Sequence, residues 1–185
     1  HNKNCPQYKK IMTLYNISKI KRIDEMPMIP SRLFKSFNLK STNSKIVKVM
    51  SSSGTSGNSS KINLDSKNAL NQTLVLKKLF YDNFGKNRYP MLIIDQNPKY
   101  KKKFDASVAA ILGFSIFGKN HTYAIDASGN LDIDKIKKFY VDNKNQIKFI
   151  FGFTSKIYEF LLNNIDNKLF KINMSKDFLL HGGGW

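Results

Sequence analysis

The segment YPMLIIDQNP (residues 89–98) opens the part of the chain that decides the fold. Its stretch YPMLIID (89–95) predicts a buried strand, and Gln96-Asn97-Pro98 predicts the turn that ends it. From here on, strand and helix patterns alternate about four times, which is typical of an α/β fold with a mostly parallel sheet and flanking helices. The elements expected next are a helix over 104–113, a strand over 121–126, a helix over 131–143, a strand over 146–153, a helix over 154–164 and a strand running into a glycine turn over 176–184.

A strand-loop-strand pattern and a helix precede this part of the chain. KIVKVM (45–50) and KINL (61–64) predict short strands, and helical spacing follows over 65–84, where Asp65 or Ser66 can cap the first turn. Ser/Gly runs are usually flexible linkers, but the one between these strands is only about ten residues long. We therefore expect it to form a tight connecting loop.

The composition indicates a single folded domain. Of the 185 residues, 41% are hydrophobic, which excludes a largely disordered chain. We expect an N-terminal segment (1–44) ahead of an α/β core (45–185). No apolar run reaches the roughly 20 residues that span a membrane, and the lone Cys5 cannot form an internal disulfide. These features predict a cytoplasmic protein.

The chain is strongly basic, with 31 lysines and arginines against 13 aspartates and glutamates, a net charge of +18 at pH 7. Such a charge favours an anionic partner: nucleic acid, nucleotide phosphates or an acidic protein. Only Arg22, Arg32 and Arg88 are arginine, the residue on which base readout relies, so the sequence argues against nucleic acid. The run 101–103, three lysines before a helix, is expected to be a solvated face.

The first candidate site is the run SSSGTSGNSS (51–60) with the lysine that follows it. Glycines let successive backbone N–H groups point into one concavity, and hydroxyls add donors, so such a loop can bind phosphate oxygens. It is not a Walker A loop, because Ser59 and Ile62 stand where that motif has glycine and Ser or Thr. A tight loop without a ligand is the alternative.

The second candidate site is the run HGGGW (181–185), which follows an apolar stretch. Three glycines at a strand end cost conformational entropy unless a ligand must approach the backbone closely. In lipase-like hydrolases an HGGG run supplies oxyanion-hole N–H groups, but the accompanying G-x-S-x-G sequence does not occur here. A tight turn is again the alternative. Both glycine runs follow strands, and α/β sheets bind ligands at the carboxyl ends of strands.

The sequence does not indicate a metal centre. A zinc site needs three or four clustered ligands, and the histidines are only His1, His121 and His181. Cys5 lies alone near a terminus, without the neighbouring base that marks a nucleophile.

Five spaced segments carry a resemblance to one enzyme family. SSGTSG after an apolar strand is similar to the phosphate-binding signature of adenylate-forming enzymes. More specifically, the chain resembles the acyl-protein synthetase (LuxE-type) family of the bacterial fatty-acid reductase system. The matching segments, in order, are MIPSRLFKS (28–36), SSSGTSGNSSKI (51–62), AILGFSIFG (110–118), FGFTSKIYEFL (151–161) and LLHGGGW (179–185).

The resemblance implies a ligase with two half-reactions. The carboxylate of a fatty acid, or of another carboxylic acid, attacks the α-phosphorus of ATP, giving acyl-adenylate and pyrophosphate, with Mg²⁺ neutralising phosphate charge. The acyl group then moves to a protein thiol and on to a reductase partner that makes aldehyde. Such chemistry depends on positioning and charge stabilisation. The α/β core would be the N-terminal part of the large domain of an adenylate-forming enzyme.

Carried onto this chain, the resemblance implies three groups of site residues. The β- and γ-phosphates of ATP would be held by Ser52, Ser53, Gly54, Thr55, Ser56, Gly57 and Lys61. The adenine or acyl-adenylate would lie along His181, Gly182, Gly183, Gly184 and Trp185. The acyl channel would be shaped by Phe151, Gly152, Phe153 and Thr154.

The chain departs from the family pattern in two respects. The family's lysine three residues after the second glycine would stand at Ser60, and Lys61 is one step later, on the other face of a strand. The family's Y-G-x-x-E segment, which supplies an Mg²⁺-binding acid, and its acyl-accepting cysteine do not occur here. We therefore expect residues 1–185 to be the N-terminal half of such an enzyme and to be inactive alone. The other hypotheses are a serine hydrolase with an HGGG oxyanion hole and a basic module that binds nucleic acid or an acidic partner.

Overall fold

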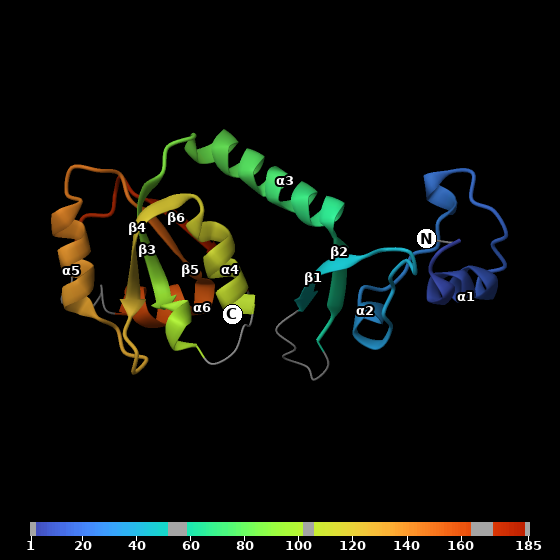
Figure 1. The fold of residues 1–185 in the computed structure, drawn as a ribbon. Helices are drawn as coiled ribbons and strands as arrows, with labels where there is room; N and C mark the ends of the chain where they lie inside the picture. The colour runs from blue at the N-terminus through green and yellow to red at the C-terminus, as the bar shows by residue number, and fades with distance from the viewer. Residues whose placement is uncertain (1–2, 52–58, 102–105, 164–171, 184–185) are drawn as a thin grey trace. The chain divides into compact units, whose positions relative to one another are not determined.

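The computed structural model describes residues 3–51, 59–101, 106–163 and 172–183 (Figure 1). It divides into two compact units, His1–Lys78 and Leu79–Trp185. Within the described residues, no helix has the length and apolar character that crossing a membrane requires.

The N-terminal unit contains the predicted strand-loop-strand. β1 (Ile46–Ser51) and β2 (Lys61–Asp65) pair in antiparallel register, with Ser51 opposite Lys61. α3 (Ser66–Phe84) follows β2 directly, and the Asp65 carboxylate accepts a hydrogen bond from the Asn68 backbone N–H at 2.8 Å, as a capping residue does. The elements ahead of the hairpin are α1 (Pro6–Leu14), η1 (Ile23–Glu25) and α2 (Leu33–Ser36).

The C-terminal unit contains a four-stranded sheet in the order β4-β3-β5-β6, and all three neighbouring pairs are parallel. The prediction of an α/β fold with a mostly parallel sheet and flanking helices is confirmed. β3 is an interior strand of this sheet, and the side chains of Met91 to Ile94 are completely buried because both faces are covered. The strands are β3 (Tyr89–Gln96), β4 (Gly118–Ile125), β5 (Phe149–Phe153) and β6 (Phe178–Gly182).

Helices cover the two faces of this sheet with different side chains. Leu92, Ile94 and Ile150 face a mainly aliphatic cluster to which α5 (Ile133–Asp142) and η3 (Ile157–Leu162) contribute. The opposite face is aromatic: Phe80 of α3 stacks on Phe117 with ring centroids 4.1 Å apart, and Phe114 of α4 (Ala106–Ser115) lies 4.9 Å from Phe151. Figure 1 shows α4 and α5 on opposite sides of the sheet.

Strand β4 begins three residues earlier than the sequence predicts. The residues before His121 are polar and lack a strand pattern, yet Gly118 and Lys119 pair with the first residues of β3. Asn120 has a φ of 48°, and the register between the two strands shifts at this point. A local irregularity in the ladder therefore hides the beginning of the strand from a periodicity argument.

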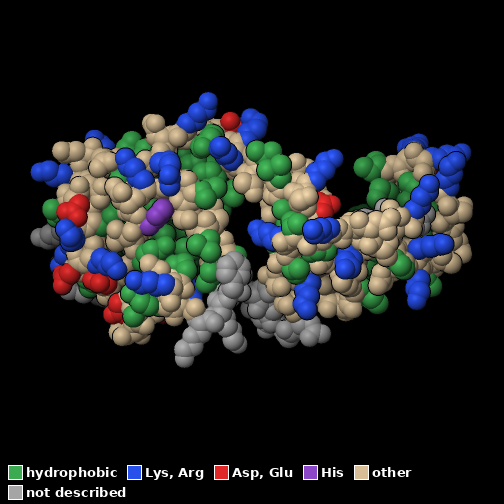
Figure 2. Space-filling view, viewed as in Figure 1, with side chains coloured by type: hydrophobic (Ala, Val, Ile, Leu, Met, Phe, Trp, Pro, Cys, Tyr) green, Lys and Arg blue, Asp and Glu red, His purple; other side chains and the backbone are tan. Residues whose placement is uncertain are grey.

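Figure 2 shows the lysine and arginine side chains spread over both units on the face that it presents. They are interspersed with polar and apolar side chains and do not gather into one stripe on that face. A nucleic-acid partner is normally marked by a clustered basic patch, so this distribution adds no support to that hypothesis.

Candidate functional site

The carboxyl ends of the four parallel strands meet at one edge of the sheet. Phe151 of β5 pairs with Ile93 of β3 on one side and with Leu180 of β6 on the other, so the last residues of these strands lie level. This edge is where α/β sheets bind ligands. The polar residues that the strands place there are therefore the candidates for a ligand site.

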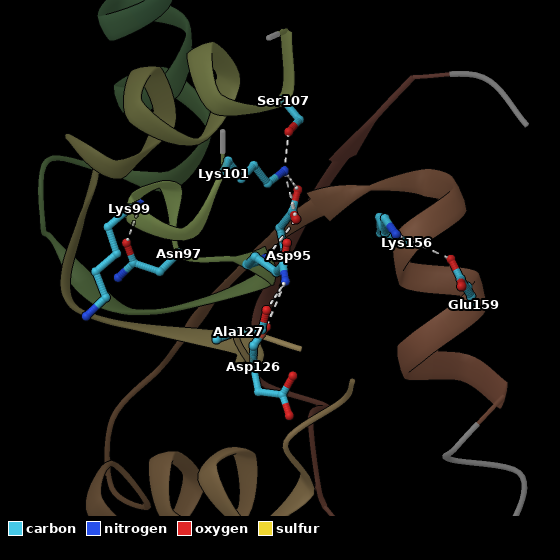
Figure 3. Close-up of polar contacts among 10 residues, drawn as sticks. Asp95, Asn97, Lys99, Lys101, Ser107, Asp126, Ala127, Lys156 and Glu159 are labelled. Atoms are coloured by element: carbon cyan, nitrogen blue, oxygen red, sulfur yellow. Dashed lines mark hydrogen bonds and ion pairs between the residues drawn. The ribbon is translucent and has the colours of Figure 1, made fainter. Parts of the chain in front are cut away.

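A buried ion pair lies at the end of β3 (Figure 3). The Nζ of Lys101 is 3.0 Å from the Asp95 carboxylate, and the two side chains are 16% and 6% exposed. The same ammonium contacts the hydroxyl oxygen of Ser107, in the first turn of α4. The cluster thus ties the segment after β3 to α4. The expectation that Lys101 belongs to a solvated face is wrong, because the buried Asp95 carboxylate requires a cation; Lys102 and Lys103 lie outside the described residues.

The turn after β4 is fixed to the end of β3. The side-chain amide of Gln96 donates to the backbone carbonyls of Asp126, at 2.9 Å, and Ala127, at 3.3 Å (Figure 3). The Asp126 carboxylate accepts hydrogen bonds from the backbone N–H groups of Ser128 and Asn130, 2.8 and 2.9 Å away. The predicted turn over 127–130 is confirmed, and the Asp126 carboxylate stabilises it.

The ends of β5 and β6 bring together two residues that the sequence assigned to different groups. Thr154 begins α6 (Thr154–Lys156) directly after β5, and His181 lies in β6. The Thr154 hydroxyl oxygen is 3.0 Å from Nδ1 of His181, 3.3 Å from the Gly182 carbonyl oxygen and 3.2 Å from that of Gly183. A proposed acyl-channel residue therefore contacts the proposed adenylate-binding turn.

The backbone conformation of the glycine turn favours glycine at one of its positions. Gly183 has a φ of +91°, and a Cβ there would lie 3.1 Å from the ring of Phe153. At Gly182 a Cβ would meet nothing within 4 Å. The turn is thus preorganised at Gly183 and open at Gly182, while Gly184 and Trp185 lie outside the described residues.

The remaining acyl-channel residues differ in exposure. Phe151 is buried against Phe114, and a Cβ at the buried Gly152 would come within 3.0 Å of both Ile94 and Ile157. Those two positions belong to the packed core between the strand and its helices. Phe153 and Thr154 are only partly buried and lie at the carboxyl edge. These two are the residues of the group that a ligand at the edge can reach.

The candidate phosphate loop belongs to the N-terminal unit. Ser52, Ser53, Gly54, Thr55, Ser56 and Gly57 lie outside the described residues. Lys61 is the first residue of β2 and its side chain is exposed. The hairpin that holds both ends of this loop was predicted, and its register places Lys61 directly beside the loop.

A second buried ion pair lies at the amino end of the sheet, away from the candidate edge. Lys148 precedes β5 and Asp177 precedes β6, with 3.5 Å between Nζ and the carboxylate. The Asp177 carboxylate also accepts a hydrogen bond from the Lys148 backbone N–H at 3.1 Å. Burial raises the pKa of Tyr140, and the negative charge of Asp177 raises it further. The pair fixes the β5–β6 register, which in turn sets Gly152 opposite His181.

Sequence reasoning missed the partners in these polar clusters. Asp95 was expected only as the last residue of a strand, and Ser107 only as part of a helix. The signal available was an acidic residue at the end of an apolar strand, since such a carboxylate is buried and must find a cation. Nothing in the sequence shows that the cation is six residues further on.

Comparison with known protein families gives a match that covers the whole chain. A family model described as acyl-protein synthetase, LuxE, matches residues 1–185. The match therefore includes both compact units, and with them the hairpin loop and the glycine turn. The search of curated proteins found no match.

Proposed function

We propose that this chain, which belongs to the acyl-protein synthetase (LuxE) family, binds ATP and a fatty acid and takes part in forming an acyl-adenylate. Family membership makes the chain an enzyme sequence of the acyl-protein synthetase class. The nucleotide, the intermediate and the acyl acceptor are the parts that we propose.

The proposed chemistry has two steps. A carboxylate oxygen of the fatty acid attacks the α-phosphorus of ATP, the bond from that phosphorus to the bridging oxygen of pyrophosphate breaks, and acyl-adenylate forms. A protein thiolate then attacks the acyl carbon, and AMP leaves as a thioester forms. The nucleophiles in these two steps are the fatty-acid carboxylate and the thiolate of the acceptor. The residues of this chain therefore contribute by positioning and charge.

The observation that supports this proposal best is the glycine turn at the end of β6. Its backbone is accessible at Gly182, where a Cβ would meet no atom within 4 Å, and it bends at Gly183, which has a positive φ. A hydrogen bond from Thr154 connects the turn to the end of β5. A flat ligand such as a purine ring can approach a backbone without Cβ atoms more closely than any other. The turn also lies at the edge where α/β sheets bind nucleotides. We assign the adenylate to this turn, and its acyl end to the side of Phe153 and Thr154.

The phosphates of ATP are assigned to the Ser/Gly loop of the hairpin, residues 52–57, with Lys61. Backbone N–H groups and hydroxyls in a glycine-rich loop bind phosphate oxygens, and an ammonium at its end neutralises charge. The exposed Lys61 side chain, opposite Ser51, is the described residue that supports this assignment.

We propose that Mg²⁺ accompanies ATP, but the described residues do not fit a protein-built Mg²⁺ site. Among them, no group of three His, Cys, Asp or Glu side chains gathers to hold an ion. Asp95, the buried acid at the candidate edge, is already paired with Lys101.

The proposed partners are a fatty acid, an acyl-accepting protein thiol and a reductase that consumes the thioester. The lone cysteine of this chain is buried and therefore not a plausible acceptor. We also propose that the reaction takes place in the cytoplasm, because a single cysteine without a disulfide partner is typical of a reducing compartment.

The proposal is tested by fatty-acid-dependent exchange of labelled pyrophosphate into ATP. Exchange is measured across fatty acids of increasing chain length. We expect exchange in the full-length protein only when fatty acid and Mg²⁺ are present.

Two further assays separate the other hypotheses. Hydrolysis of a fatty-acyl ester without ATP would replace the proposal with a serine hydrolase. Binding to nucleic acid that falls steeply with salt and ignores ATP would replace it with a basic binding module. Absence of exchange under all conditions, with the protein folded, would contradict adenylation.

A further inference from the structure

The hydroxyl of Thr154 faces three hydrogen-bonding groups with a single proton to give. Its oxygen is 3.0 Å from Nδ1 of His181 and within 3.3 Å of the carbonyl oxygens of Gly182 and Gly183. A threonine hydroxyl is one donor and accepts through two lone pairs, while a carbonyl oxygen can only accept. The positions of the two carbonyls therefore constrain where the proton lies.

Only one arrangement gives every atom around this hydroxyl a favourable neighbour. If the proton pointed at Nδ1 of His181, the oxygen lone pairs would face both glycine carbonyls without a hydrogen between them. If the proton points at the carbonyls, a lone pair of the Thr154 oxygen is left facing Nδ1. That lone pair is satisfied when Nδ1 carries a hydrogen. The neutral ring is then protonated at Nδ1 and bare at Nε2.

We propose that Thr154 is a positioning residue that holds His181 in the Nδ1–H tautomer and so presents a bare Nε2 as a hydrogen-bond acceptor to the bound nucleotide. The inference rests on the proposed function only for the identity of the ligand. The ligand group must be a donor, which on an adenine nucleotide is either the 6-amino group or a ribose hydroxyl. A nucleotide base with a carbonyl in place of the 6-amino group has an acceptor at that position, and its nearest donor, N1–H, lies one ring position away.

The second histidine within the described residues provides an internal reference. Nε2 of His121 lies 2.8 Å from the backbone carbonyl oxygen of Ser115. Since a carbonyl oxygen can only accept, Nε2 of His121 must carry the hydrogen when the ring is neutral. The two histidines are therefore expected in opposite tautomers, and one spectrum reports both.

The tautomers are measured directly by nitrogen-15 NMR of the histidine rings in the full-length protein, at a pH where the rings are neutral. Resonances are assigned by their loss in His181→Gln and His121→Gln. We expect Nδ1–H for His181 and Nε2–H for His121. In Thr154→Val, which keeps the shape and removes the hydroxyl, His181 should lose this preference, and Thr154→Ser should restore it, while His121 stays unchanged in both. An Nε2–H ring at His181, or a tautomer indifferent to Thr154→Val, would overturn the proposal.

The role toward the nucleotide is measured by pyrophosphate exchange with ATP, inosine triphosphate and the 2′- and 3′-deoxy forms of ATP. Thr154→Val should raise KM for ATP severalfold, up to the roughly tenfold effect of one lost hydrogen bond, with a smaller change in kcat, and Thr154→Ser should not. For the nucleotide that lacks the donor, KM should already be raised and should not respond to Thr154→Val. If Thr154→Val leaves KM unchanged only for inosine triphosphate, the donor is the 6-amino group. If KM is unchanged only for one deoxy form of ATP, the donor is the hydroxyl that this form lacks. An equal effect on all four nucleotides would overturn the role in binding. If the wild type shows no exchange at all, the proposed function fails, whereas the tautomers still decide the assignment of Thr154.

Discussion

The ammonium of Lys101 lies 3.0 Å from the carboxylate of Asp95, and the two side chains are largely buried at the carboxyl end of the central strand. The two residues come from β3 and from the segment that follows it, so the pair closes a short loop onto the sheet. Because Ser107 also contacts the ammonium, the pair connects the strand to α4. The acid at this edge is thus a structural residue whose carboxylate is already paired with a cation.

Removing either member of this pair should destabilise the protein strongly. Lys101→Met leaves the Asp95 carboxylate buried without its cation, which costs about 3–5 kcal/mol in the free energy of unfolding. The double variant Asp95→Leu/Lys101→Met should recover much of that loss, because it leaves no unpaired charge. The free energies are measured by urea unfolding followed by circular dichroism.

The control for this prediction is the exposed pair Lys138–Asp142 on α5, where the ammonium and carboxylate are also 3.0 Å apart. Lys138→Met should cost less than about 1 kcal/mol, because water solvates both charges. Equal losses for Lys101→Met and Lys138→Met would mean that the Asp95–Lys101 pair is not buried in solution.

The two described glycines of the HGGGW run should respond differently to alanine. Gly183→Ala places a Cβ on a residue with a φ of +91° and 3.1 Å from the ring of Phe153, so we expect a loss of about 1–3 kcal/mol in stability. Gly182→Ala meets no atom within 4 Å and should leave stability almost unchanged. The variants are compared by urea unfolding and by KM for ATP in the exchange assay. If Gly182→Ala raises KM while stability holds, the ligand approaches the backbone at that residue. If neither alanine changes KM, the adenylate does not lie along this turn.

The parallel sheet could be predicted from the sequence because burial on both faces leaves a clear apolar signal. The segment 89–95 and β3 coincide to within one residue, and so do 61–64 and β2. The cap of α3 was equally readable, since Asp65 accepts from the backbone N–H three residues later. These signals are local, and local signals can be read without knowledge of the tertiary structure.

The polar clusters could not be predicted because they depend on residues that only the fold brings together. Thr154 and His181 are 27 positions apart, and their contact follows from the register of β5 against β6. That register is fixed by Lys148 and Asp177 at the other end of the strands. A shift by one residue would place His181 on the opposite face of the sheet. Sequence patterns identify strands but do not specify such a register.

Lys61 should contribute to ATP binding, and its hairpin offers a matched control. Lys61→Met removes the ammonium beside the Ser/Gly loop, and we expect KM for ATP to rise about tenfold or more, since a hydrogen bond to a charged group is worth about 1.5–3 kcal/mol. Lys48→Met removes the same charge from β1, where Lys48 lies opposite Leu64 and further from the loop, and KM should change less than about twofold. Equal changes in both variants would indicate a general effect of net charge and would contradict a phosphate contact by Lys61.

Stability at alkaline pH should depend on Tyr140. Burial, and then the charge of Asp177, raises the pKa of the Tyr140 phenol above its ordinary value of 10.0. Above about pH 10 the unfolded chain loses this proton while the folded protein retains it, so the folded state binds more protons and stability falls as pH rises. For one proton the slope is about 1.4 kcal/mol per pH unit, and below about pH 10 the contribution is constant.

In Tyr140→Phe this component is absent, so the difference in unfolding free energy between wild type and variant should change steadily between about pH 10 and pH 11.5, in favour of the variant. Parallel curves for wild type and Tyr140→Phe would show that the phenol is not buried beside Asp177.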